Sequence, residues 1–232
     1  MPEYCHKDTP PPFIQFPQEP TAQFVLFTNA RLFDGKAASL TEPYEVLVHK
    51  NIIRKVGPLV PVPQDVKLVK VDCQGQTLMP GLIDMHAHIL LQKEATADAV
   101  TAGARGAQDL HDYLQQGFTT VRDAGGATVG LAQAVAQGQL TGPRIFSSGP
   151  LLTTNDSSNN VMATACHGPT QVLQQCRQQL QQGATQLCLA AGGAVTTEDP
   201  LHVTHFTVEE MTAAVQVAED YGTYVMAVCN CI

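Results

Sequence analysis

Two histidines separated by one residue are the feature of this sequence with the clearest potential for chemistry. His86 and His88 end a short apolar segment, 82–88, which follows the turn signal Pro80-Gly81. On an extended strand, side chains two residues apart point to the same face, so the two imidazoles are expected side by side. Neutral imidazoles at that spacing form half of a site for a borderline divalent metal, with zinc the first choice. Because a bare His-x-His pair also arises by chance, the metal site is a hypothesis at this point.

Composition restricts the class of protein and its partners. The chain has 232 residues, of which 44% are hydrophobic and 15% charged, as in a soluble globular protein of one or two domains. The net charge of −8 disfavours a surface that binds phosphates, so nucleic acid is not an expected partner. No run approaches the roughly 18 apolar residues of a membrane span, and no apolar signal segment is found at the start, so we expect a cytoplasmic protein without a membrane partner. The seven cysteines are scattered, which indicates buried thiols rather than a disulfide framework.

The elements ahead of the histidines indicate two further parts of the chain. Residues 1–22 are rich in proline and lack periodicity, so we expect an extended or disordered arm. Residues 23–77 contain short strand-like runs, which predict a small β-sandwich-like module. We place these strands at 24–27, 45–49, 52–56 and 66–71.

In residues 78–232, strand-like and helical segments alternate, which is typical of parallel β/α units. The last helix is predicted from the capping box Thr207-Val-Glu-Glu210, with Met211, Ala214, Val215 and Ala218 directed inward. We therefore predict an α/β fold in which the small β-sheet module precedes about five strands of a (β/α)₈ TIM-type barrel, a truncated version of the eight-stranded form. The expected strands are 82–88, 119–122, 144–147, 185–189 and 224–228, and the other helices are 94–116, 129–137 and 170–182.

Several motifs in register resemble the amidohydrolase superfamily, in particular its prolidase-like, imidazolonepropionase-like and ochratoxinase-like branch. They are Pro80-Gly-Leu-Ile-Asp-Met-His-Ala-His88, Gly117-Phe-Thr-Thr-Val-Arg-Asp-Ala-Gly-Gly126 and Gly142-Pro-Arg-Ile-Phe-Ser-Ser-Gly149. The resemblance runs from about Phe24 to the last residue and matches the N-terminal portion of such proteins. It implies hydrolysis of an amide or peptide C–N bond, in a small-molecule or dipeptide-like substrate, by a metal-activated hydroxide.

The resemblance also implies a set of metal ligands. In the superfamily, two strand-one histidines and a strand-eight aspartate bind one metal, strand-five and strand-six histidines bind a second, and a carboxylated strand-four lysine bridges them. It therefore assigns His86 and His88 as metal ligands and names no catalytic residue here. Cys188 stands at the lysine position, either as a degenerate thiolate bridge or, by preference, as core filler. Val228 stands at the strand-five histidine position and cannot bind a metal, so we expect one weak site for zinc or another divalent ion.

Other cysteines and histidines are weaker candidates. Cys229 and Cys231 resemble half of a thiolate site, although an accidental pair is the preferred interpretation. His202 and His205 follow the fourth barrel strand, where they either approach the barrel mouth or, by preference, lie in a solvated loop. His167 is assigned no role.

Two hypotheses of different classes remain. The chain is a metal-dependent amidohydrolase by family, or it is a catalytically inactive, truncated or degenerate relative that serves as a remnant or a binding protein. Because the bridging lysine and one histidine are replaced, we expect the chain to be inactive alone. We also expect self-association, since the first and fifth barrel strands would each keep a free apolar edge.

Overall fold

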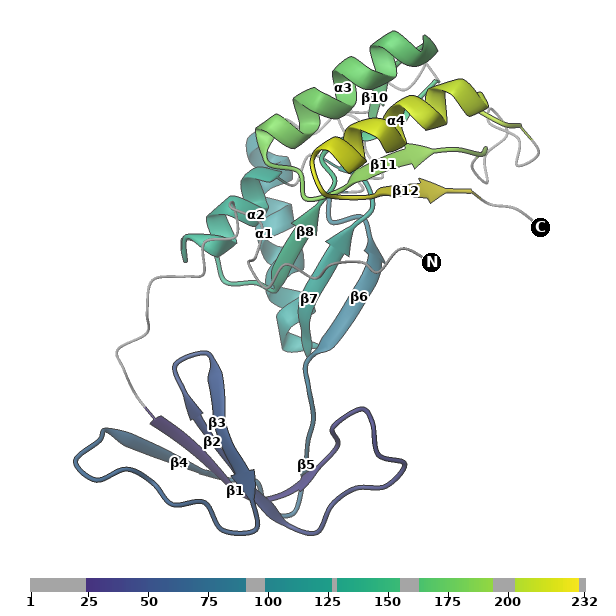
Figure 1. The fold of residues 1–232 in the computed structure, drawn as a ribbon. Helices are drawn as coiled ribbons and strands as arrows, with labels where there is room; N and C mark the ends of the chain where they lie inside the picture. The colour runs from purple at the N-terminus through teal and green to yellow at the C-terminus, as the bar shows by residue number, and fades with distance from the viewer. Residues whose placement is uncertain (1–23, 91–98, 127–128, 155–162, 194–202, 230–232) are drawn as a thin grey trace. The chain divides into compact units, whose positions relative to one another are not determined.

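The structure is a computed structural model that describes residues 24–90, 99–126, 129–154, 163–193 and 203–229. The described residues form two compact units, one ending at Gly81 and the other beginning at Leu82 (Figure 1). The predicted proline-rich arm lies outside the described residues.

The first unit is a five-stranded sheet in which β1 is the central strand. β1 (Phe24–Leu32) pairs antiparallel with β2 (Tyr44–His49) and parallel with both β4 (Leu68–Asp72) and β5 (Thr77–Leu78). β3 (Ile52–Gly57) adds to β2 through a hairpin in which Lys50 takes a positive φ of 57°. One small core, centred on Leu26, Leu47 and Val60, holds the sheet together.

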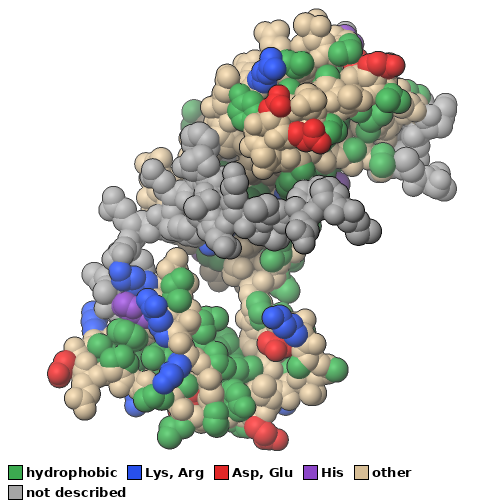
Figure 2. Space-filling view, in the orientation of Figure 1, with side chains coloured by type: hydrophobic (Ala, Val, Ile, Leu, Met, Phe, Trp, Pro, Cys, Tyr) green, Lys and Arg blue, Asp and Glu red, His purple; other side chains and the backbone are tan. Residues whose placement is uncertain are grey.

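Much of this unit's apolar surface is exposed. Ile53 and Leu59 are 64% and 81% exposed, and Val69 and Val71 on β4 are each 38% exposed. Figure 2 shows hydrophobic side chains gathered on the visible face of the unit. The strand predicted at 66–71 is therefore present, beginning at Leu68, but its valines do not face a core.

The second unit begins with three parallel strands in sequence order, β6 (Leu82–Ala87), β7 (Phe118–Asp123) and β8 (Arg144–Ser147). A further parallel sheet has the order β10 (Ala163–Ala165), β9 (Leu151–Thr153), β11 (Leu187–Ala190) and β12 (Val225–Val228). The backbone N–H of Thr185 donates to the carbonyl of Ser147 over 2.7 Å, which joins β8 to the start of β11. The strands thus follow one another as in the expected partial barrel, and the α/β fold class is confirmed.

The third barrel strand is present as predicted at 144–147, but a break after it and a further short strand, β9, were not predicted. Gly149 adopts a positive φ of 71° between β8 and β9, and Pro150 has no backbone N–H to donate to a neighbouring strand. The chain resumes strand pairing at Leu151, which pairs with Ala163 of β10, and Leu152 then pairs with Leu189 of β11. The short strands β5, β9 and β10 were not predicted.

The described residues of the second unit include the helices α1 (Ala99–Gln115), α2 (Val129–Ala136), α3 (Gly168–Gln182) and α4 (Val208–Asp220). α3 and α4 lie side by side against β11 and β12 (Figure 1). Their buried residues form one core with Leu187 and Leu189 of β11. A second core joins Val121 of β7 to Leu110 of α1 and to Ala87, Ile89 and Ile145.

The predicted inward face of α4 was wrong at one position. Ala214 and Ala218 are buried, as expected, but Val215 is 44% exposed and Val217 is buried in its place. An α-helix advances about 100° per residue, so positions 214, 217 and 218 share one face while 215 turns away from it.

Candidate functional site

A β-bulge shapes the end of β6, where the two histidines lie. Asp84 pairs with Val121 and Ala87 pairs with Asp123, so three steps along β6 match two steps along β7. The extra residue interrupts the regular alternation of sides. Ala87 packs into the core beneath α1, and Asp84 accepts a hydrogen bond from the Tyr113 hydroxyl over 3.3 Å.

His86 and His88 flank Ala87 and lie close together. Their ring centroids are 5.2 Å apart, with an angle of 68° between the ring planes. His86 is exposed and its backbone N–H donates to Asp84 Oδ1 over 3.0 Å, whereas His88 is half-buried. The expected side-by-side arrangement of the two imidazoles is therefore present.

The ring of His88 is held by the backbone of the following turn. Its Nδ1 atom lies 3.2 Å from the carbonyl oxygen of Gly125. A carbonyl only accepts, so this hydrogen bond requires the proton on Nδ1 and leaves the lone pair on Nε2. Histidines that bind metals usually have their second ring nitrogen anchored in this way. The chemistry of His88 therefore fits a metal ligand that binds through Nε2.

Gly125 holds this carbonyl in a conformation that other residues rarely adopt. Its φ is +135°, and an added Cβ would approach the Cβ of Leu151 to 2.9 Å. Both the backbone angle and the close contact favour glycine at this position.

Cys188, at the expected bridge position, is fully buried on β11. Its Sγ donates to the carbonyl oxygen of Ala124 over 3.0 Å. Burial, followed by the negative charge of Asp123, raises the pKa of the thiol to about 12. A thiol with this pKa keeps its proton at neutral pH while it donates to Ala124. These contacts favour the interpretation of Cys188 as core filler.

Val228, at the expected strand-five position, is the last residue of β12 and pairs with Ala190. Within the described ranges, no group of three or more His, Cys, Asp or Glu side chains is placed to hold a metal. His86 and His88 are therefore a two-ligand partial site among these residues.

Arg122 has contacts at the site that the sequence analysis did not foresee. Its Nε donates to the carbonyl of Met85 over 2.7 Å, directly before His86. Its Nη1 lies 3.4 Å from the hydroxyl of Tyr224, and the guanidinium carbon lies 5.9 Å from the centroid of the Tyr224 ring. The bulged segment of β6 is thus tied to the residue that precedes β12.

Asp123 is a second residue without a predicted role. It is fully buried, and its Oδ1 accepts a hydrogen bond from the backbone N–H of Ile89 over 3.3 Å. The sequence signal that could have identified Asp123 was the charged pair Arg122-Asp123 at the end of a predicted buried strand. Charged residues are uncommon at such a position unless they are paired.

The weaker histidine and cysteine candidates have other surroundings or lie outside the residues that the structure describes. His205 is half-buried beside the end of β11, where its backbone N–H donates to the carbonyl of Ala191 over 3.1 Å. His167 occupies the N-cap position of α3 without a side-chain capping hydrogen bond, and its backbone N–H donates to the Gln171 side chain. Cys229 is exposed. His202 and Cys231 lie outside the described residues.

No helix in the described part of the chain combines the length and the apolar character needed to cross a membrane.

Comparison with known proteins gives consistent matches. The model of the amidohydrolase family matches residues 77–230. Ochratoxinase from Aspergillus niger is 24% identical over 217 residues, covering 78% of this chain and 45% of that protein. A solved prolidase, complexed with N-methylphosphonate-L-proline, is 32% identical with a TM-score of 0.81, covering 89% of this chain and 56% of that chain.

A second solved structure, a Xaa-Pro dipeptidase with bound methionine, is 26% identical with a TM-score of 0.76, covering 89% of this chain and 56% of that chain. The chain thus spans about half the length of the relatives it matches.

Proposed function

Since the chain belongs to the amidohydrolase family, we propose that its barrel unit serves the metal-dependent hydrolysis of amide or peptide C–N bonds. The observation that carries this proposal is the His86–His88 pair, in which the carbonyl of Gly125 orients the ring of His88. We propose a small, dipeptide-like substrate, because similar solved structures include a prolidase and a Xaa-Pro dipeptidase.

His86 and His88 would hold one divalent ion, with zinc favoured by the nitrogen donors. When bound, the ion would supply Lewis-acid activation of water and of the amide carbonyl. The protein's own residues prepare the ligands: Gly125 anchors His88, and Arg122 restrains the carbonyl of Met85 before His86.

A second candidate is a catalytically inactive relative that retains only metal binding. One observation in its favour is Cys188, which stands at the position of the family's bridging lysine and donates its thiol proton to the carbonyl of Ala124. The other is Val228, which stands at the position of a metal-binding histidine. Two neutral imidazoles leave a divalent ion short of both ligands and compensating charge. We therefore expect the 232-residue chain to show no hydrolysis on its own.

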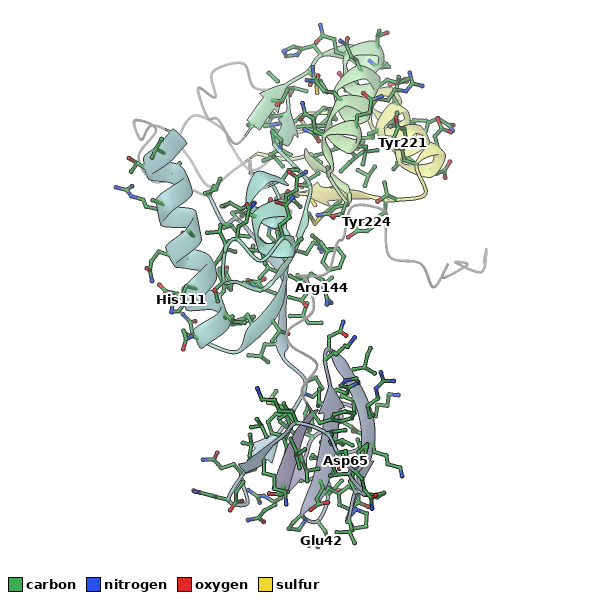
Figure 3. All side chains as sticks on the ribbon, turned by 90° about the vertical axis from the view of Figure 1, so that its left-hand side faces the viewer. Glu42, Asp65, His111, Arg144, Tyr221 and Tyr224 are labelled. Atoms are coloured by element: carbon green, nitrogen blue, oxygen red, sulfur yellow. The ribbon has the colours of Figure 1, made fainter. Side chains whose placement is uncertain are left out.

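One experiment separates the candidates. The zinc-loaded chain is assayed on Xaa-Pro dipeptides and N-acyl amino acids, beside His86→Ala and the control His111→Ala, a histidine exposed on α1 (Figure 3). Zinc-dependent turnover that only His86→Ala abolishes supports the enzyme. Zinc binding without turnover supports the inactive relative. An absence of zinc binding contradicts both.

We also propose that the chain self-associates through its barrel strands. Among the described residues, β6 pairs only with β7, and β12 pairs only with β11. β6 carries three exposed apolar side chains, with Leu82, Ile83 and Met85 exposed by 41%, 57% and 52%. Exposed apolar edge strands favour pairing with another chain.

A further inference from the structure

The end of β7 contacts the end of β6 on both sides of His88. The backbone N–H of Ala124 donates to the carbonyl of Ala87 over 2.7 Å, immediately before the histidine. Asp123 Oδ1 accepts from the backbone N–H of Ile89 over 3.3 Å, immediately after it. The two peptide groups that flank His88 are therefore held by adjacent residues of one neighbouring strand.

The third contact fixes the ring itself. The carbonyl of Gly125 accepts from Nδ1 of His88, so three consecutive residues, 123–125, act on the histidine from its backbone to its ring. These contacts span 37 positions for the ring and 34 for the carboxylate. The hydrogen bond between Ala124 and Ala87 continues the pairing of Ala87 with Asp123, whereas the other two contacts use the side chains of Asp123 and His88, so β-sheet formation does not account for those two.

From these contacts we infer that Asp123 is a positioning residue for His88, because it holds the peptide after His88 and so keeps Nδ1 within reach of the Gly125 carbonyl. The role of this orientation in metal binding rests on the function proposed above. A buried carboxylate is costly unless it accepts hydrogen bonds, and the N–H of Ile89 donates one to it from the segment directly after β6. Asp123 does not itself bind the metal in this assignment.

The test compares Asp123→Asn with Asp123→Ala, and Asp112→Asn on the exposed side of α1 is the matched control. Long-range ¹H–¹⁵N correlation spectra of the metal-free protein report which ring nitrogen of His88 carries the proton. Titration with zinc reports metal affinity. Asp123→Asn keeps an oxygen that can accept from Ile89, so it should retain both the Nδ1–H tautomer and the affinity. Asp123→Ala should give a mixture of tautomers and a loss of about 10–100-fold in zinc affinity.

An Asp123→Ala protein with the wild-type tautomer and affinity would overturn the inference. If Asp123→Ala does not fold, the spectrum of the metal-free wild type decides. A His88 ring protonated on Nε2 overturns the inference. A ring protonated on Nδ1 supports it, provided that Asp123→Asn shows the same tautomer and zinc affinity as the wild type. If the wild-type chain binds no zinc, the proposed function fails, while the tautomer still tests the positioning role separately.

Discussion

The Sγ atom of Cys188 donates a hydrogen bond to the carbonyl oxygen of Ala124 over 3.0 Å, joining β11 to the turn after β7. The same turn supplies the carbonyl of Gly125 to the ring of His88. The residue at the expected bridge position is therefore used to hold the turn that orients a candidate ligand.

Cys188 should resist thiol reagents in the folded chain, because it is buried and keeps its proton. Cys229 is exposed and serves as the internal reference. Peptide mapping by mass spectrometry, after brief alkylation at pH 8, should find Cys229 modified and Cys188 unmodified. Modification of both at similar rates would show that Cys188 is accessible as a thiolate.

The stability of the chain should fall as the pH rises from about 9 to about 12. Burial raises the pKa of Cys166 to about 11 and those of Cys176 and Cys188 to about 12, from an ordinary value of 9.0. Above pH 9 the unfolded chain loses these protons while the folded chain keeps them, so each thiol lowers the free energy of unfolding by up to about 1.4 kcal/mol per pH unit.

Cys188→Ser isolates one of these contributions, since a serine hydroxyl can donate to Ala124 but does not titrate in this range. Denaturant titrations between pH 8 and pH 11 should give a shallower decline for this variant than for the wild type. An equal decline of the unfolding free energy in both proteins would mean that Cys188 has the same pKa in the folded and unfolded chains.

The purified chain should bind at most one divalent ion per molecule, and weakly, through His86 and His88. Elemental analysis after dialysis against zinc should give less than one equivalent, and His86→Ala or His88→Ala should reduce it to background. His111→Ala should match the wild type, because this histidine is exposed on α1. Two tightly held ions per chain would contradict the two-ligand assignment.

Glu210 should stabilise the junction of α3 and α4 through its charge. Its carboxylate accepts from the backbone N–H groups of Thr207 and Gly168, each over 2.7 Å. The hydrogen bond from Thr207 is the main cause that lowers the pKa of Glu210 from its ordinary value of 4.5. The stabilisation is therefore present above pH 4.5 and is lost as the pH falls through the folded-state pKa.

Glu210→Gln should accordingly cost about 0.5–2 kcal/mol of unfolding free energy at pH 7, the usual range for a lost cap, and less at pH 3. Glu209→Gln changes an exposed carboxylate in the same helical turn and is the matched control. Denaturant titration at the two pH values measures the difference, and an equal cost at both would exclude the charged hydrogen bonds as its source.

The purified chain should self-associate through β6. Light scattering at increasing concentration should show masses above that of the monomer, and Ile83→Lys should shift the population toward monomer because a charge on an edge strand opposes pairing. His111→Lys places a new charge on an exposed helical position as the control. A monodisperse wild-type monomer would rule out association through this edge.

The order of elements was predictable because it depends on local patterns. The succession of short strand-like runs and helical segments predicted the five main strands of the second unit, and the capping box at Thr207 predicted the start of α4. The proximity of His86 and His88 was predictable for the same reason, since one intervening residue on a strand separates them. Local periodicity did not separate Val215 from Val217, because a small error in helical phase exchanges the buried and exposed positions.

The contacts that define the candidate site were decided by tertiary structure. The bulge in β6 depends on its register with β7, and the pairing of β9 with β10 and β11 depends on which strands this segment can reach. His88 meets Gly125 across 37 positions of sequence, and Cys188 meets Ala124 across 64. Residue types and short spacings identify groups that can do chemistry. The hydrogen-bond partners that set their orientation and protonation come from distant segments, which only folding brings together.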